Sequence, residues 1–219
     1  MKSTFVGEFF GTLFLVMIII GSGIMGESLS QGNEGLALLA NSLSTGLGLF
    51  VLIQVIGSFS EAHFNPVVSL VDYLFKNIDL KKLSVMWMAQ FLGAIIGIFL
   101  VHKMYDLSLF QISTKVRYGS NLWISEFIAT FGLIALIRLI KIKNISNASF
   151  IISSYIISAY WFTSSTSFAN PAVTVARMLT NTFGGITPIC APGFILSQIL
   201  GAFGAYFFLR YFLRFSHGS

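Results

Sequence analysis

The sequence predicts an all-α membrane protein with six transmembrane helices and two shorter re-entrant half-helices. Apolar residues make up 55% of the 219 residues and charged residues only 10%, whereas a soluble domain carries about 25% charged residues. The apolar residues gather into long runs, and two shorter stretches each begin with Asn-Pro. Together these observations predict a single membrane-embedded domain over 1–219.

Six apolar runs are long enough to form helices across a bilayer, whose core of about 30 Å requires roughly 20 helical residues. The fifth run is the shortest and is rich in serine. The first run could be mistaken for a cleaved signal peptide, but Glu8 interrupts it and no clean small-residue cleavage site follows. The expected spans lie near 4–25, 36–59, 83–104, 121–141, 148–164 and 192–214.

The two Asn-Pro stretches predict half-helices over 65–76 and 170–181, each too short to cross a membrane. Proline is well tolerated in the first helical turn, because the N–H that it lacks would have no intrahelical partner there. The loops before them, near 58–64 and 162–169, must then enter the membrane. Irregular backbone at that depth is tolerated where it is buried or lines a water-filled cavity. The stretches therefore indicate an aqueous path.

The two halves of the chain repeat the same motifs in the same order, which predicts an internal repeat of 1–104 and 121–219. Glu8 and Glu126 occupy the first span of each half, and Gln90 and Gln198 recur in the third, where we interpret them as helix contacts. Three spans per half is an odd number, so the second half is inverted relative to the first. The half-helices then enter from opposite faces and meet with their N-termini near the midplane.

Charge placement predicts the topology and excludes several functions. The net charge is +5, but the basic residues lie at the ends of apolar runs rather than along one face, which argues against nucleic-acid binding. Lysines such as Lys76, Lys82 and Lys141 favour cytoplasmic termini. Cys190 is the single cysteine, so an intrachain disulfide is excluded. No metal cluster, phosphate loop or nucleophile–base set predicts an enzyme, a metal or a cofactor.

The meeting half-helices also predict how the path treats solutes. A helix N-terminus carries roughly half a positive charge and unpaired N–H donors, so two of them facing one path oppose cations. The Asn65 and Asn170 amides add N–H donors for a passing oxygen. Backbone carbonyls are expected to supply acceptors, namely those of Ala62, His63, Phe64, Thr166, Ser167 and Phe168. Such a path conducts neutral hydroxylated solutes and opposes ions.

Two Asn-Pro motifs at matching places in an inverted repeat resemble those of the aquaporin, or major intrinsic protein, family over nearly the whole chain. The motifs read Phe64-Asn65-Pro66-Val67-Val68 and Ala169-Asn170-Pro171-Ala172-Val173. The resemblance implies a right-handed six-helix bundle with a pore in every protomer. It also implies a homotetramer in the cell membrane, with lipid and small neutral solutes as its partners.

The resemblance assigns roles to three ionisable residues. It implies that Glu8 and Glu126 brace the re-entrant loops by accepting backbone N–H bonds, a role that we favour over direct solute contact. His63 matches a loop histidine near the cytoplasmic end of the pore, where a hydrogen-bonded loop residue and a pH gate both remain open. Val67 replaces the usual alanine of the first motif and is expected to alter packing between the half-helices.

The selectivity filter is where the sequence departs from typical members. The residue after the second Asn-Pro-Ala is Val173 instead of arginine, and ungapped spacing places Thr45, Ser158 and Ser167 at the other positions. One gap on the fifth span would substitute Ala159 or Tyr160 for Ser158. Small side chains predict a wide opening that admits glycerol, urea or neutral metalloid hydroxides.

Arg177 lies four residues after Val173, on the same helical face. It either extends over the outer vestibule or bonds loop carbonyls at the helix end. The stretch 164–177 is also similar to a bacterial subgroup often associated with arsenic resistance, which implies arsenite or a methylated arsenical as a solute.

Three alternative functions stay open at the level of the sequence. A water-selective pore has the same architecture with a narrower filter. A secondary transporter with inverted repeats needs a coupling site, yet Glu8 and Glu126 are the only acids placed inside the predicted spans. A structural junction protein would use the same fold with a closed pore.

Overall fold

The computed structural model describes residues 1–216, with side chains to residue 212, and within that range the chain forms eight α-helices. The last three residues of the predicted second repeat lie outside the described part. The helices are α1 Lys2–Leu29, α2 Glu34–Ile56, α3 Pro66–Leu74, α4 Leu80–Met104, α5 Ser120–Lys143, α6 Ala148–Phe162, α7 Pro171–Met178 and α8 Ala191–Ser216.

Five of these helices, α1, α2, α4, α5 and α8, are long and apolar enough to cross a membrane. The remaining long element, α6, has 15 residues and ends at Phe162 rather than at the predicted residue 164. At about 1.5 Å per residue, α6 is shorter than a bilayer core. The prediction of an all-α membrane bundle is confirmed, with the difference that its fifth span is a short helix continued by a re-entrant loop.

The half-helices α3 and α7 are three and four residues shorter than predicted, and each is capped by its asparagine. The Asn65 side chain accepts a hydrogen bond from the Val67 N–H. Asn170 accepts from the N–H groups of Ala172 and Val173. Asparagine is a favourable N-cap because its side-chain oxygen satisfies an otherwise unpaired donor of the first turn. The same residues thus begin both half-helices and terminate both re-entrant loops.

Glycines allow the long helices to approach closely at matching places in the two halves. A Cβ at Gly93 of α4 would overlap the Phe9 carbonyl of α1, and a Cβ at Gly201 of α8 would come within 2.5 Å of the Phe127 carbonyl of α5. Small residues permit such backbone contact between membrane helices, where packing rather than water drives association. The pairs α1–α4 and α5–α8 are accordingly among the closest in the bundle.

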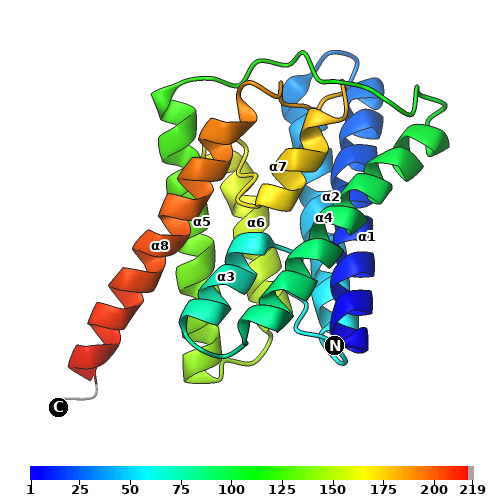
Figure 1. Ribbon diagram of the computed structural model, residues 1–219. Coiled ribbons are helices and arrows are strands. Elements are labelled where there is room, and N and C mark those ends of the chain that lie inside the picture. Colours follow the sequence, from blue (N-terminus) through cyan, green and yellow to red (C-terminus); the bar gives the residue numbers. More distant parts are fainter. Residues whose placement is uncertain (217–219) are drawn as a thin grey trace.

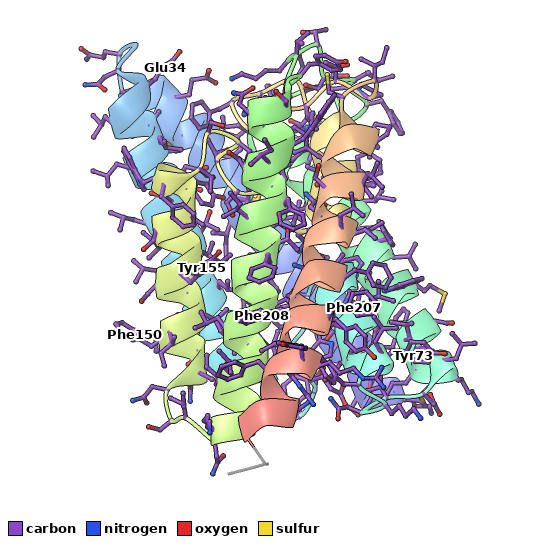
Figure 2. All side chains as sticks on the ribbon, turned by 90° about the vertical axis from the view of Figure 1, so that its left-hand side faces the viewer. Glu34, Tyr73, Phe150, Tyr155, Phe207 and Phe208 are labelled. Carbon is purple, nitrogen blue, oxygen red and sulfur yellow. The ribbon has the colours of Figure 1, made fainter. Side chains whose placement is uncertain are left out.

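The half-helices occupy opposite halves of the bundle and point their N-termini toward its middle (Figure 1). The start of α1 and the end of α8 lie at one end, which we call the termini side; the loop over 105–119 crosses the opposite end, the loop side. Large apolar side chains such as Phe150, Phe207 and Phe208 project outward from the bundle (Figure 2). An outward apolar surface of this kind suits contact with lipid.

Candidate pore and its lining

The two asparagines bond across the centre of the bundle in a reciprocal pair. The Asn65 Nδ2 donates to the Ala169 carbonyl at 2.8 Å, and the Asn170 Nδ2 donates to the Phe64 carbonyl at 2.8 Å. Each amide carries two N–H donors, so one on each asparagine remains for another acceptor. Both side chains line the same cavity. The motifs therefore present two N–H donors at the point where the half-helices meet.

The backbone before each asparagine takes the same uncommon path in both loops. Ala62 and Phe64 have φ values of 51° and 50°, and their equivalents Ser167 and Ala169 have values of 48° and 47°. Non-glycine residues in this left-handed region cost of order 1–3 kcal/mol each, so the surrounding structure must hold them. The loops therefore need partners outside their own backbone.

Glu8 provides those partners for the first loop. Its carboxylate accepts the His63 N–H at 2.8 Å and the Phe64 N–H at 2.7 Å. The Gln90 amide donates to the same carboxylate at 2.7 Å and to the Ser69 hydroxyl at 2.9 Å. Glu8 is fully buried and does not line the cavity. Its contacts tie α1, α4 and α3 to the loop.

Glu126 repeats this arrangement in the second half. It accepts the Phe168 N–H and the Ala169 N–H, each at 2.9 Å, and the Gln198 amide at 2.7 Å. Gln198 also donates to the Thr174 hydroxyl at 2.9 Å. In both halves the carboxylate accepts from the two residues before the asparagine and from a glutamine of the third long helix.

One cavity of about 480 Å³ runs between the half-helices. It begins on the termini side, where Lys141 and Asn144 line it, passes both asparagines and reaches Arg177. Nine of the predicted pore residues line it: Thr45, Ala62, His63, Phe64, Asn65, Ser167, Phe168, Asn170 and Val173. The prolines of the motifs, Pro66 and Pro171, and Ala172 are buried in the helix starts behind it.

The prediction that Ser158 belongs to the filter is wrong. Ser158 is exposed on the outside of α6, where its hydroxyl donates to the Ser154 carbonyl at 2.9 Å. The α6 residues that line the cavity are Ala148, Ile152, Ile156 and Tyr160, spaced by four positions. Residues four apart share a helical face, and a residue two positions away points to the other side. Tyr160 therefore lines the cavity at the place expected for Ser158, and the lining includes an aromatic side chain there.

Two other expectations need correction. Thr166 does not line the cavity; Ala169 does, and its carbonyl accepts from Asn65. Val67 faces away from the cavity and packs with Ala202 and Ala205 of α8. The extra methyl groups of Val67 therefore bear on the contact between α3 and α8 rather than on the contact between the half-helices.

The termini-side mouth contains a charged cluster that the sequence reading missed. Asp72 of α3 lies 3.1 Å from Lys141 Nζ, 3.8 Å from Arg138 Nη1 and 3.6 Å from His63 Nε2. Glu61 lines the same mouth and pairs with Lys82. The signal in the sequence that could have revealed this cluster is Asp72, an acidic residue inside the apolar first half-helix.

His63 lies in the loop between α2 and α3, outside the spanning helices, and lines the cavity. Its Nδ1 is 3.1 Å from the Ser69 hydroxyl. Burial lowers the pKa of His63 to about 4, although the charge of Asp72 acts in the opposite direction. The imidazole is therefore neutral at physiological pH.

The arrangement defines a class of protein. Two helix N-termini and two free amide donors face one continuous cavity inside an apolar bundle. The helix ends add partial positive charge at the midplane, which repels cations that must shed their hydration, while neutral solutes exchange hydrogen bonds with the lining. These features are those of a pore-forming membrane protein selective for neutral solutes.

Comparisons with known proteins agree with this class. A family model described as Major intrinsic protein matches residues 1–160. Aquaglyceroporin AqpS of Rhizobium meliloti (strain 1021) is 46% identical over 209 residues, covering 95% of this chain and 89% of that protein. Aquaporin TIP1-2 of Zea mays is 34% identical over 134 residues, covering 59% of this chain and 52% of that protein. The X-ray structure of the aquaglyceroporin from Plasmodium falciparum shares the fold, with a TM-score of 0.70 at 22% identity and 94% of each chain covered.

The chain therefore belongs to the major intrinsic protein family. It is a multi-pass membrane channel for water and small neutral solutes. The predicted family, fold class and general function are confirmed.

Proposed function

We propose that this channel passes solutes larger than water, such as glycerol and urea, through the cavity between the re-entrant loops. The observation that carries the proposal is the short side chains of Val173 and Ser167 beyond the asparagines, in a continuous cavity of about 480 Å³. Thr45 and Tyr160 complete the lining at that level. Val173 stands where the family resemblance leads one to expect arginine, so a long charged side chain is replaced by a small one.

The free N–H donors of Asn65 and Asn170 are proposed to receive the oxygen of each passing solute. Carbonyls of the lining residues before each motif then serve as acceptors on the two sides of the midplane. A solute with hydroxyl or amide groups exchanges its water hydrogen bonds for these, whereas a cation meets the positive helix ends. The matched contacts of Glu8 and Glu126 support the proposed inverted repeat that sets up this symmetry.

Flux measurements on proteoliposomes test the proposal. Stopped-flow light scattering should show fast shrinkage in an impermeant osmolyte, followed by re-swelling when the osmolyte is glycerol or urea. Water flux without glycerol or urea entry would favour the water-selective alternative. Saturable flux that requires an ion gradient would favour a secondary transporter, and no conductance at all would favour a junction protein.

A metalloid is a further proposed solute. Neutral arsenite carries hydroxyl groups on a compact centre, which suits the same donors and acceptors as glycerol. The similarity of 164–177 to a subgroup associated with arsenic resistance supports this choice. Uptake of arsenite or a methylated arsenical by proteoliposomes at neutral pH, compared with empty vesicles, is the direct test; uptake equal to that of empty vesicles would contradict it.

We also propose that the protein is a homotetramer in the cell membrane with both termini in the cytoplasm. The termini side carries Lys76, Lys82 and Lys141 at the ends of α3, α4 and α5, which the positive-inside rule places in the cytoplasm. Labelling of single cysteines on the two sides tests the orientation. Crosslinking in native membranes tests the assembly, because a tetramer gives a ladder that ends at four protomers.

A further inference from the structure

Arg177 of α7 is a buried cation at the loop-side end of the cavity. Its side chain is 2% exposed and lines the cavity together with Tyr160 and Thr45. Among the described residues, none from 105–119 or 179–190 lines this cavity, although those segments cover the loop side. The lining of the cavity therefore ends at Arg177 on this side.

The Arg177 guanidinium has hydrogen-bond donors without protein acceptors. Its Nη2 lies 3.5 Å from the Tyr160 hydroxyl, a long contact, and its Nε is buried without any partner. Within the described residues, no carboxylate forms an ion pair with it. A guanidinium carries five N–H donors, and Arg177 lines the cavity, so its Nη donors are placed to meet an acceptor there.

An aromatic ring holds Arg177 in this position, and a second cation lies near it. Its guanidinium lies 3.8 Å from the centroid of the Phe168 ring, which is a cation–π contact. Arg117, from the loop over 105–119, lies 5.3 Å from the same ring and donates its Nε to the Gly185 carbonyl at 2.9 Å. A second positive charge near the first strengthens the repulsion of cations, because low-dielectric surroundings screen charges poorly.

A hydrogen-bonded row crosses the cavity at this level. The Tyr160 hydroxyl of α6 donates to the Thr45 hydroxyl of α2 at 3.3 Å and faces Arg177 of α7. Ser167, which lines the same cavity, has a buried hydroxyl without a partner. Val173 lies one helical turn before Arg177 on the same face and is too short to fill the space that Arg177 borders. Arg177 Nε and Ser167 Oγ are both buried without a hydrogen-bond partner, on residues that line the same cavity.

We propose that Arg177 is a specificity-determining residue of this channel: it binds acceptor oxygens of neutral polyhydroxylated solutes and excludes cations by its uncompensated charge. The inference rests on the proposed function, in which solutes pass through this cavity. Arginine thus acts from four residues beyond the filter position that Val173 occupies. A solute with several oxygens offers Arg177 more acceptors than the single oxygen of a water molecule does.

The experiment compares Arg177→Met and Arg177→Lys with wild type in proteoliposomes. Arg210→Met is the matched control, because Arg210 also contacts a tyrosine hydroxyl, that of Tyr206 at 3.0 Å, but is exposed outside the cavity. Three quantities are measured on each protein: osmotic water flux, glycerol flux, and proton leak with an entrapped pH dye. Retained water flux shows that a variant is inserted and open.

Arg177→Met is expected to raise the proton leak about tenfold over wild type, while the half-helix ends still oppose cations at the midplane. Arg177→Lys keeps the charge and loses the planar fork of donors, so the leak stays low and the glycerol-to-water flux ratio falls about threefold or more. Arg210→Met is expected to match wild type in all three quantities.

An inserted Arg177→Met protein with an unchanged leak would overturn the cation-excluding role. An unchanged glycerol-to-water ratio in Arg177→Lys would overturn the solute-binding role, and this variant decides the matter if Arg177→Met does not insert. Wild-type protein that conducts water but no glycerol contradicts the proposed function instead, and the leak comparison still tests the charge of Arg177.

Discussion

Replacement of Glu126 by glutamine is expected to destabilise the second re-entrant loop. The Glu126 carboxylate accepts three hydrogen bonds, from the N–H groups of Phe168 and Ala169 and from the Gln198 amide. A glutamine presents one oxygen and one NH₂ group, so it places a donor against two other donors. Glu126→Gln therefore loses about two charge-assisted hydrogen bonds.

The size of the effect follows from those contacts. Hydrogen bonds to charged groups contribute about 1.5–3 kcal/mol each, so the loss of two costs about 3–6 kcal/mol of folding free energy. If the Gln198 side-chain amide flips so that its oxygen accepts a hydrogen bond from the new glutamine, the cost is about half of that. Removal of a buried charge relieves some desolvation cost, but donors left without partners outweigh that gain. For a protein of this size, a loss of about 3 kcal/mol lowers the Tm by about 6–12 °C.

Thermal unfolding of the purified protein in detergent measures this shift, and osmotic water flux in proteoliposomes reports whether the loop still shapes an open pore. Glu8→Gln should give a shift of similar size, because Glu8 makes the equivalent bonds in the first half. Glu27→Gln on the exposed surface of α1 is the control and should leave the Tm unchanged. A Glu126→Gln protein with the Tm of the control would refute the bracing argument.

Three further results are expected. Val173→Arg places a long cation beside the asparagines, so glycerol flux should fall at least about tenfold while water flux falls much less; equal losses would show a collapsed pore instead. Tyr160→Phe removes a hydroxyl facing the cavity and should change the glycerol-to-water ratio, whereas Ser158→Ala, on the outside of α6, should have no effect in the same assay. Flux should be constant from pH 8 to about 5.5, because burial lowers the pKa of His63 to about 4. The pKa of His63 in the folded protein lies below the ordinary histidine value of 6.5, so the stability of the fold decreases as pH drops from 6.5 through 4. A Tm that stays flat over that window would contradict the burial of His63.

Much of the pore followed from local sequence because it depends on short-range rules. Asn-Pro predicts a capped helix start wherever it occurs, and two such starts in an inverted repeat have to meet. The capping bonds of Asn65 and Asn170 span two or three residues, so the sequence contains everything that they need. Nine of the predicted pore residues accordingly line the cavity.

The filter was harder to predict because it joins residues that are far apart in the chain. Ser158 was placed by counting back from Asn170 across a helix end and a loop, and α6 ends at Phe162 with the re-entrant loop still to come. A shift of two positions on a helix moves a side chain to the other face. The charged cluster around Asp72 was not predicted because it also joins distant residues: its partner Lys141 is 69 residues away in the chain.

The sequence by itself determined the membrane class and the two capped half-helices, because composition, periodicity and capping act over a few residues. Only the tertiary structure decided which side chains share the cavity. The Tyr160 hydroxyl bonds a threonine 115 residues away and faces Arg177 from another helix, and no local rule sets that distance. Arg177 lies one turn beyond Val173, and its place at the cavity depends on the packing of α2, α6 and α7 around it.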